Sequence, residues 1–332
     1  MRVLVTGGAG YVGSHAVRAL CAAGHEVTVL DDLSSGHAAA VLPPARLVVG
    51  DLADRELLEA VRSRRTFDAV MHFSACIEVG ESVVDPLKYY DSIAANTVGL
   101  LRAMQAAGVR RLVFSSSAAV YGVPESSPIR ESNPRRPASP YARAKNAVEW
   151  MLEDSAAAWG LGFAALRYFN AAGASADGRL GEDHEPETHL IPNVLRVALG
   201  RAERVRVFGT DYDTPDGTCV RDYVHVEDLA DAHVRALQAL SPGAARVYNC
   251  GTGRGASVRE VIETARSVTG HSIPSEEHPR RPGDVPLLVA DATRLREELG
   301  WAPSRPSLRE IIASAYAWHR AHPDGFNDRR KE

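Results

Sequence analysis

Short apolar runs alternate with helical stretches throughout residues 1–170, and this alternation limits the folds open to the chain. Within each run, polar and apolar residues do not follow one another in turn as they do in half-exposed strands. We therefore expect strands that are buried on both faces. Buried strands separated by helices are typical of a doubly wound α/β fold, in which helices cover both faces of a parallel sheet. We expect strands at Arg2–Thr6, Glu26–Leu30, Arg46–Val49, Asp68–Phe73, Arg111–Ser115 and Gly162–Tyr168, and helices at Tyr11–Ala23, Asp54–Arg64, Leu87–Ala107 and Pro140–Trp159.

The chain of 332 residues is longer than one hydrophobic core usually supports, so we expect two parts. Residues 1–170 carry the alternating pattern, whereas residues 171–189 are rich in Gly, Asp, Glu and His and are predicted to form a loop. We therefore expect a smaller C-terminal part at 171–332, with segments near 218–252 that return to the first part. The last residues, 324–332, are expected to be frayed.

The composition disfavours several classes of function. A net charge of −4 gives no sign of a nucleic-acid partner. No apolar run reaches about 18 residues, so we expect no membrane span, and the first residues do not resemble a secretory signal. The four cysteines (Cys21, Cys76, Cys219 and Cys250) match no metal-binding spacing and are expected to be free thiols. We therefore expect a cytoplasmic protein without a metal site.

A glycine-rich turn joins the first expected strand to the first expected helix. The segment VLVTGGAGYVGSHAV contains Gly8-x-Gly10-x-x-Gly13, and Gly7, Gly10 and Gly13 also fit a GxxGxxG spacing. Such a turn is tight, brings the backbone close to a pyrophosphate and packs the helix closely on the strand. The N–H groups at the helix N-terminus then face the phosphates. A plain turn is the alternative, but the flanking strand and helix favour the dinucleotide-binding turn of a Rossmann fold.

Two acidic residues follow the next expected strands. Asp31 lies 18 residues after Gly13, where a carboxylate binds the ribose 2′-hydroxyl and repels a 2′-phosphate. We therefore expect NAD rather than NADP as the cofactor. Asp51, after the third strand, is a candidate contact for the adenine, and a plain loop acid is an equal alternative.

The segment SPYARAK places Tyr141 and Lys145 one helical turn apart. Ser139 and Pro140 suit the start of a helix, so the two side chains are expected to share a face. A pair of this kind is most often a surface pair. Two features favour a function here: a dinucleotide-binding turn lies upstream, and only three of the 38 lysine and arginine residues are lysines. Arginine differs from lysine in shape and hydration, so a retained lysine suggests a specific need.

The pair suits the removal of a hydroxyl proton from a sugar while hydride leaves the same carbon. Tyrosine ordinarily has a pKa of about 10, which must fall by about 3 for a base that acts near neutral pH. A positive charge at about 5 Å supplies most of that effect, so we expect Lys145 to lower the pKa of Tyr141, with the nicotinamide ring of NAD⁺ adding the rest. Ser117 is expected to hold the same hydroxyl.

Eight segments occur in an order that resembles the UDP-glucose 4-epimerases of the extended short-chain dehydrogenase/reductase superfamily: GGAGYVGSH, HFSACIEVGES, FSSSAAVYG, SPYARAK, LRYFNAAGA, GTCVRDYVHVEDLADAH, VYNCGTG and RRPGDVP. The resemblance covers nearly the whole chain. It implies that a UDP-hexose is epimerised at C4 through a 4-keto sugar, with NAD taking and returning the hydride. Tyr141 would act as base and then as acid, assisted by Lys145 and Ser117.

The glycine turn and the resemblance together imply two sets of binding residues. Those for NAD are Gly7, Gly10, Tyr11, Val12, Gly13, Asp31, Asp32, Leu33, Ser34, Asp51, Leu52, Phe73, Ser74, Ala75, Ser92, Ser115, Tyr141, Lys145 and Phe169. Those for the UDP-sugar are Ser117, Tyr141, Asn170, His189, Leu190, Arg206, Val207, Phe208, Arg221, Tyr223, Arg281, Asp284 and Leu288. Physically, Arg221 and Arg281 suit a diphosphate, and Phe208 offers an apolar neighbour to uracil.

Several positions depart from the family's pattern. Ile77 stands where a family lysine contacts the cofactor, and Ser92 and Ile93 stand on two family asparagines. His189 occupies a position that is usually asparagine or histidine. Leu288 stands where narrow epimerases carry a bulky tyrosine beside the sugar, so we expect room for the N-acetyl group of UDP-GlcNAc or UDP-GalNAc.

The resemblance also implies a homodimer in which helices at Leu87–Ala107 and Pro140–Trp159 pair across a two-fold axis into a four-helix bundle. The alternative is that both apolar faces pack within one chain. Light scattering distinguishes the two.

Other functions fit parts of the pattern. A nucleotide-sugar 4,6-dehydratase needs an acid and a base where Ala118 and Ala119 stand, which disfavours it. A UDP-uronate 4-epimerase stays open, since contacts to the sugar C6 cannot be identified in the sequence. An ordinary dehydrogenase would exchange its NAD with solvent. The alternative outside enzymes is an NAD-binding regulatory protein on the same fold, although such proteins tend to lose the base that Tyr141 and Lys145 provide here.

Overall fold

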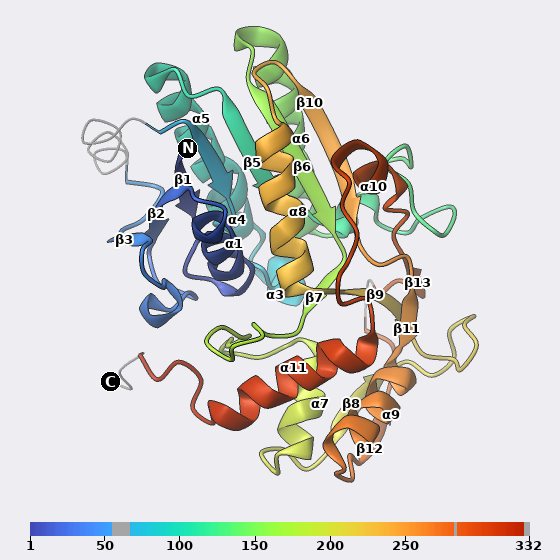
Figure 1. Ribbon diagram of the computed structural model, residues 1–332. Coiled ribbons are helices and arrows are strands. Elements are labelled where there is room, and N and C mark those ends of the chain that lie inside the picture. Colours follow the sequence, from blue (N-terminus) through green and yellow to red (C-terminus); the bar gives the residue numbers. More distant parts are fainter. Residues whose placement is uncertain (55–66, 282–283, 329–332) are drawn as a thin grey trace.

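A parallel sheet of seven strands forms the centre of the molecule (Figure 1). The computed structural model describes residues 1–54, 67–281 and 284–328. Across the sheet the strands follow the order β10, β6, β5, β4, β1, β2, β3. Their bounds are β1 Arg2–Thr6, β2 Glu26–Asp31, β3 Arg46–Val49, β4 Ala69–His72, β5 Arg111–Ser115, β6 Gly162–Tyr168 and β10 Ala245–Cys250. The doubly wound fold is confirmed, and the six expected strands agree with the structure to within one residue at each end.

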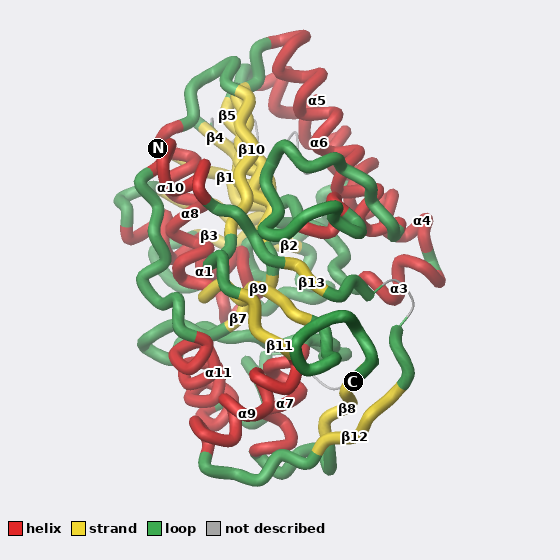
Figure 2. The backbone as a smooth tube through the Cα atoms, turned by 90° about the vertical axis from the view of Figure 1, so that its right-hand side faces the viewer, coloured by secondary structure: helices red, strands yellow, loops and turns green. Residues whose placement is uncertain are grey.

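Helices cover both faces of this sheet, which Figure 2 shows nearly edge-on. One layer contains α1 (Tyr11–Ala22), α8 (Val226–Ala239) and α10 (Thr293–Leu299), and the other contains α5 (Asn96–Ala107) and α6 (Pro140–Trp159). On β1, Val3 and Val5 belong to the hydrophobic cluster beneath α1 and α8, whereas Leu4 belongs to the cluster beneath α5 and α6. Both faces of the strand are therefore buried, which explains why its sequence is apolar throughout.

The range Leu87–Ala107 is helical throughout, as expected, but it consists of three consecutive segments rather than one regular α-helix. After α3 (Val79–Val84) come α4 (Pro86–Tyr89), a π-helical segment η2 (Tyr90–Ala95) and then α5. A π segment keeps the chain helical while it widens the turn, so the apolar spacing of the sequence does not reveal it. The helix expected at Asp54–Arg64 lies almost wholly outside the described residues.

A smaller group of elements packs below the carboxyl ends of the large sheet (Figure 1). Strand β9 pairs with three neighbours, and β8 pairs with β12. Helices α7, α9 and α11 cover them around a separate hydrophobic cluster. The bounds are β7 Asn170–Ala172, α7 Leu190–Ala198, β8 Val205–Phe208, β9 Val220–His225, β11 Gly255–Ser257, α9 Val258–Thr269, β12 Ser275–His278, β13 Leu287–Leu288 and α11 Leu308–Ala321. Two short 3₁₀ turns, η1 Ala38–Ala40 and η3 Ala118–Tyr121, follow β2 and β5 of the large sheet.

The chain does not separate cleanly at residue 170. Helix α8 packs against α1, and β10 pairs with β6 at the edge of the large sheet, although both follow β9 in the sequence. The division into parts at 1–170 and 171–332 stays a prediction.

The last described residues fold back onto the first part of the chain. The Asp328 carboxylate lies 2.7 Å from Nδ1 of His37 and accepts the backbone N–H of Ala39. The N–H of Phe326 donates to Asp183. The expectation of a frayed tail is thus wrong for residues 324–328, because polar partners, among them the buried His37, hold this segment.

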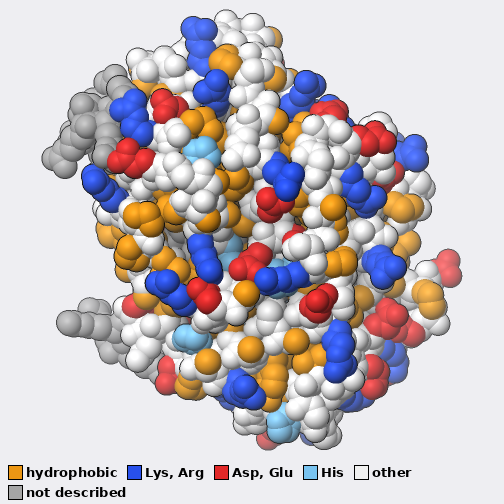
Figure 3. All heavy atoms as spheres, in the orientation of Figure 1, with side chains coloured by type: hydrophobic (Ala, Val, Ile, Leu, Met, Phe, Trp, Pro, Cys, Tyr) orange, Lys and Arg blue, Asp and Glu red, His pale blue; other side chains and the backbone are white. Residues whose placement is uncertain are grey.

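The surface mixes charges of both signs. Figure 3 shows acidic and basic side chains interspersed over one face of the molecule. Within the described part of the chain, no helix combines the length and apolar character that crossing a membrane requires.

A buried ion pair fixes α6 to the sheet. The side chains of Glu149 and Arg167 are 0% and 4% exposed, and the Arg167 Nε donates to Glu149 over 2.9 Å. The Ser116 hydroxyl donates to the same carboxylate over 2.6 Å. Since Arg167 lies on β6 and Ser116 follows β5, one carboxylate connects the helix to two strands. The helix begins as expected, with Ser139 accepting the N–H of Ala142.

Candidate functional site

A cavity of about 620 Å³ opens at the carboxyl ends of the large sheet's strands, the edge where open α/β sheets bind ligands. The structure brings most of the predicted site residues together around it. Those that line the cavity are Gly7, Gly10, Tyr11, Val12, Gly13, Asp31, Asp32, Ser34, Asp51, Phe73, Ser74, Ala75, Ser92, Ser115, Ser117, Tyr141, Phe169, Asn170 and His189.

Other predicted residues lie outside the cavity wall. From the NAD set these are Leu33, Leu52 and Lys145, and from the sugar set Leu190, Arg206, Val207, Phe208, Arg221, Tyr223, Arg281, Asp284 and Leu288. Leu52, Lys145 and Val207 are buried. Leu33 has a left-handed backbone (φ 60°), and its N–H donates to Asp31.

Sequence reasoning left several wall residues out of the site. They are Ser35, Gly36, Ala53, Cys76, Ile77, Val79, Asp91, Asn96, Ala119, Tyr168, Ala171, Glu182 and His184. Asp91 and Asn96 line the cavity because they lie in and directly after η2, and π segments often occur at functional sites. The Tyr168 hydroxyl lies 2.8 Å from the Ser115 hydroxyl, so the end of β6 contacts the end of β5.

The glycine turn has the geometry of a phosphate cradle. A Cβ on Gly13 would lie 2.1 Å from the carbonyl oxygen of Gly7, so packing within the protein requires glycine there. A Cβ on Gly10 would meet only that same oxygen, at an ordinary 3.5 Å. Gly10 also caps α1 without a side chain, which leaves the first N–H groups of the helix for a ligand. The open side of Gly10 therefore leaves room for a ligand at the N-terminus of α1.

Asp31 ties this turn to β2. One carboxylate oxygen accepts the N–H of Ala9 and the other accepts the N–H of Leu33, each over 2.9 Å. Burial raises the pKa of this carboxyl group. Each oxygen keeps a further lone pair, so Asp31 can hold the turn and still accept a ribose hydroxyl. Sequence reasoning gave it only the second role.

Tyr141 and Lys145 are both buried, so they are not a surface pair. Tyr141 is 8% exposed and Lys145 is 2% exposed. The Lys145 Nζ donates to the carbonyl oxygen of Ser115 over 2.8 Å. It lies 5.0 Å from the ring centroid of Phe114 and 5.9 Å from that of Tyr141. Lys145 therefore lies behind Tyr141, with its charge over the ring rather than in the cavity.

The expected lowering of the Tyr141 pKa is wrong for the protein by itself. Burial, together with the nearby Tyr168, raises the pKa of Tyr141 well above its ordinary value, although a hydrogen bond with Ser117 acts in the opposite direction. Burial also lowers the pKa of Lys145 to about 7. The expectation counted only the attraction between the two charges. It omitted the desolvation of both groups, which favours their neutral forms. Tyr141 thus needs a further positive charge beside it before it can act as a base.

Four residues predicted to bind the sugar nucleotide form a group beside the small sheet, which we call the arginine group: Phe208, Arg221, Arg281 and Asp284. The Arg281 guanidinium lies 4.7 Å from the Phe208 ring centroid. Asp284 pairs with Arg281 at 3.2 Å and with Arg221 at 3.6 Å.

Strand β9 links the arginine group to the cavity. Arg221 and Tyr223 are two residues apart and share a face of the strand. Arg221 pairs in register with Leu288, and Tyr223 pairs with Asn170 of the cavity wall.

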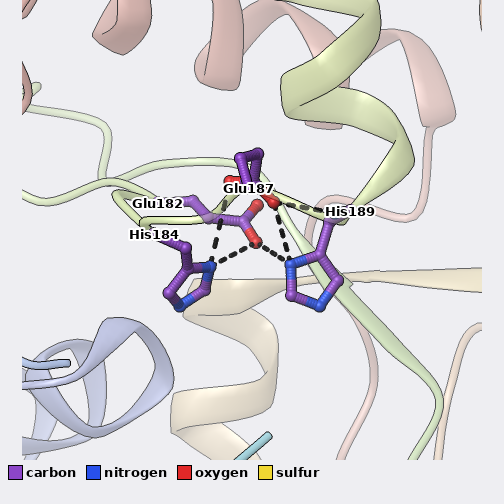
Figure 4. A group of neighbouring side chains, drawn as sticks. All are labelled: Glu182, His184, Glu187 and His189. Carbon is purple, nitrogen blue, oxygen red and sulfur yellow. Dashed lines mark hydrogen bonds and ion pairs between the residues drawn. The ribbon is translucent and has the colours of Figure 1, made fainter. Parts of the chain in front are cut away.

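A second cluster lies in the loop before α7 and contains Glu182, His184, Glu187 and His189 (Figure 4). Burial by itself would lower the pKa of His189, but the carboxylates of Glu182 and Glu187 outweigh it and raise that pKa well above its ordinary value. Sequence reasoning named only His189. The spacing E-x-H-x-x-E-x-H in GEDHEPETHL was the signal that would have found the other three.

A doubly wound sheet, a glycine turn and a buried Tyr–Lys pair beside one cavity define a Rossmann-fold enzyme of the short-chain dehydrogenase/reductase class. The chain belongs to the NAD dependent epimerase/dehydratase family, whose model matches residues 3–251.

Relatives of known name agree with this assignment. A UDP-glucose 4-epimerase from Streptomyces lividans is 53% identical over 99% of both chains. A crystal structure of UDP-glucose 4-epimerase from Bifidobacterium longum, in complex with NAD⁺ and UDP, has a TM-score of 0.94 and 39% identity, and covers 98% of this chain and 100% of its own. A UDP-Glc/GlcNAc 4-epimerase from Campylobacter jejuni has a TM-score of 0.84 and 40% identity, with coverage of 96% and 99%.

Alanine substitutions at Gly10 and Gly13 should affect stability and NAD⁺ binding differently. Gly10→Ala should keep the free energy of unfolding within about 1 kcal/mol of wild type, because the Cβ has room in the protein. The same change should weaken NAD⁺ binding at least about tenfold, because it fills the phosphate side of the turn. Calorimetric titration with NAD⁺ and urea unfolding measure the two effects.

Gly13→Ala should instead lose stability and binding together. Gly99→Ala serves as the control, because a Cβ there meets no atom within 4 Å. It should leave NAD⁺ affinity unchanged and, because Gly99 lies within helix α5, raise the free energy of unfolding by up to about 1 kcal/mol. Unchanged NAD⁺ affinity in Gly10→Ala would contradict the phosphate cradle.

Proposed function

We propose that the protein is an NAD-dependent UDP-hexose 4-epimerase that interconverts UDP-glucose and UDP-galactose. The observation that carries this proposal is the placement of Tyr141 and Ser117 on the wall of a cavity that also contains the glycine turn. The cavity thus offers a proton acceptor within the space where a dinucleotide fits. The names of the relatives that share nearly the whole chain support the substrate.

NAD, when bound, accepts a hydride and returns it, and its oxidised ring carries the positive charge that Tyr141 needs. The glycine turn would hold the pyrophosphate, and Asp31 the adenine ribose. The residues around Ser92 would face the nicotinamide half. Among them Ile77, which is 39% exposed on the cavity wall, replaces a charged contact with an apolar one.

Three residues of this chain would move and hold the proton. Ser117 would orient the C4 hydroxyl, and Tyr141 would take its proton as the C4–H bond breaks, then return it to the same oxygen once the 4-keto sugar presents its opposite face to the hydride. Lys145 stabilises the tyrosinate through its charge over the ring, while its hydrogen bond to Ser115 keeps it in place. Since all three are largely enclosed, the proton need not exchange with bulk water during the reaction.

The arginine group would bind the nucleotide. Arg221 and Arg281 suit a diphosphate, since guanidinium groups form strong hydrogen bonds with phosphate oxygens. Asp284 now holds both of them, and a diphosphate would compete for the same donors. Phe208 already stacks on a guanidinium and offers its other face to a base. Asn170 and His189, on the cavity wall, would contact the sugar and its phosphates.

The other functions have less support. A 4,6-dehydratase needs an acid and a base near η3, where Ala118 and Ala119 carry no proton. The relatives at about half identity bear the name UDP-glucose 4-epimerase rather than that of a uronate enzyme. A regulatory protein would not need the buried Tyr–Lys pair, which costs stability to enclose.

Tyr141→Phe should abolish most of the turnover. The variant keeps the ring and its packing but loses the proton acceptor, so kcat for UDP-galactose should fall by a factor of about 100 to 10,000, while NAD⁺ stays bound. Chromatography of the UDP-glucose product measures kcat, and absorbance after denaturation measures bound NAD. Tyr90→Phe, which removes a hydroxyl outside the cavity wall, should keep full activity. Turnover that survives intact in Tyr141→Phe would contradict the assignment.

We also propose that the enzyme accepts UDP-GlcNAc and UDP-GalNAc. Leu288 packs against a hydrophobic cluster that includes Phe169 of the cavity wall, and a leucine there leaves more room than a tyrosine. Leu288→Tyr should lower kcat/KM for UDP-GlcNAc at least about tenfold, as expected for overpacking by 1–3 kcal/mol, and change that for UDP-glucose little. Separate incubations with UDP-Gal, UDP-GalNAc and UDP-GalA compare the substrates. Good turnover of UDP-galactose with none of UDP-GlcNAc would refute the broad specificity.

We propose a homodimer that buries the outer faces of α3, α4 and α6. Val83, Val84 and Leu87 are 67%, 86% and 72% exposed, and Trp150 on α6 is 54% exposed. Large apolar side chains gathered on one face favour burial against a second copy. Light scattering at micromolar concentration should give twice the chain mass, and a monomer mass would refute the dimer.

We place the protein in the cytoplasm. All four cysteines carry free thiols, two of them partly accessible, and such thiols persist in a reducing compartment. Recovery of the native protein from a membrane or extracellular fraction would contradict this.

A further inference from the structure

The loop before α7 holds two histidines and two glutamates whose ligand atoms face a common point. One atom from each of Glu182, His184, Glu187 and His189 lies within 4.8 Å of all the others. In Figure 4 the two imidazole rings approach from opposite sides, with the carboxylates between and above them. The two glutamate side chains are 5% and 2% exposed.

The spacing matches the shell of a tetrahedral metal ion. Zinc binds nitrogen and carboxylate oxygen at about 2.0–2.2 Å, so two ligand atoms of a tetrahedron lie about 3.3–3.5 Å apart. The Nδ1 of His184 is 3.3 Å from Glu182 and 3.9 Å from Glu187. The Nδ1 of His189 is 2.8 Å from Glu182 and 3.2 Å from Glu187. The two distances to Glu182 end on the same oxygen, Oε1, whereas those to Glu187 end on Oε2 and on Oε1. All four lie near the tetrahedral edge, with Glu187 facing the common point through both oxygens.

The directions of the nitrogen atoms support the same conclusion. Both Nδ1 atoms are buried, yet neither makes a hydrogen bond of acceptable angle with any oxygen. The carboxylates are near enough for such bonds but lie off the direction of the ring nitrogens. Side chains that bind a shared ion direct their ligand atoms toward the ion, so these atoms lie close together without forming hydrogen bonds to one another.

We propose that Glu182, His184, Glu187 and His189 bind one divalent transition-metal ion of the zinc class. Two imidazole nitrogens and two carboxylate oxygens suit zinc, whereas magnesium and calcium prefer six or more oxygen ligands. Metal binding requires both imidazoles to be neutral, and together with two buried carboxylates they then carry a charge of about −2, which a divalent cation neutralises. The proposal departs from the expectation of a protein without a metal site.

The site would be structural rather than catalytic. With four protein ligands it leaves no open position for a substrate. It would fix the irregular loop between β7 and α7 to the cavity wall, where His184 lies edge-on to Tyr11 at 6.2 Å between ring centroids. The backbone N–H of His189 already donates to Glu187 over 2.7 Å, which orients that carboxylate. The proposal does not depend on which sugar the enzyme converts.

Metal content tests the site directly. The full chain is treated with EDTA, dialysed, and titrated with Zn²⁺ and with Co²⁺, with bound metal measured by mass spectrometry and the Co²⁺ complex by visible absorption. We expect one equivalent per chain, the intense visible bands of tetrahedral Co²⁺, and a higher unfolding temperature with metal. His184→Ala and Glu182→Gln should each weaken binding at least about tenfold.

His271→Gln is the matched control, because His271 is exposed on the surface away from the cluster, and it should bind metal as wild type does. Two variants are used because one of them can disturb folding, and circular dichroism identifies that case. Failure of wild type to bind Zn²⁺ at micromolar concentration would overturn the proposal. Equal binding by wild type and both folded cluster variants would place the metal elsewhere, for instance on Cys76, and would overturn it as well.

Discussion

The buried ion pair between Glu149 and Arg167 is the interaction on which the position of the site depends. Both side chains are almost fully enclosed, and such a pair gains little net stability because desolvation offsets the attraction. What it provides is geometry. The Glu149 carboxylate meets Ser116 after β5 and Arg167 on β6, so α6 can lie against the sheet in only one rotation and register.

That rotation decides where the reactive side chains point. Tyr141, Lys145 and Glu149 follow one another at intervals of four residues, so they form one buried polar face of α6. Glu149 anchors its far end, Lys145 reaches the carbonyl of Ser115 in the middle, and Tyr141 reaches the cavity at the near end.

Burial determines which protonation states Tyr141 and Lys145 favour on this face. Burial raises the pKa of Tyr141 well above its ordinary value and lowers the pKa of Lys145 to about 7. Both shifts disfavour the charged forms, so Lys145 is about half protonated near neutral pH, and Tyr141 keeps its proton until a further positive group shares the cavity. A base that is activated only beside an oxidised cofactor remains inactive when no hydride acceptor is present.

The sequence predicted the parts of the protein that depend on local pattern. Strand positions, the glycine turn and the start of α6 follow from apolar runs, glycine spacing and helix caps, and these agree with the structure. The buried Tyr–Lys pair was found because its spacing is local. The second role of Asp31 and the anchor from Glu149 to Arg167 were missed, because their partners lie on other strands.

Two further misses have different physical causes. The π segment η2 was missed because it shares the helical pattern of its neighbours. The cluster of Glu182 and His184 was missed because a loop rich in polar residues resembles a solvated one until its burial is known. The pKa of Tyr141 was misjudged for the same reason, since desolvation depends on the tertiary structure.

The most direct test substitutes the ion pair of Glu149 and Arg167 and leaves Tyr141 unchanged. Glu149→Gln should lower the free energy of unfolding by about 3–5 kcal/mol, because it leaves Arg167 buried without a counter-charge. The double variant Glu149→Leu/Arg167→Met should recover most of that stability, since an apolar pair of similar size needs no desolvation.

The decisive measurement is kcat of the stable double variant with UDP-galactose. If the ion pair positions α6, kcat should stay at least about tenfold below wild type with a nearly unchanged KM, because a small misplacement of Tyr141 slows the chemical step. A stable double variant with the full kcat of wild type would contradict the account.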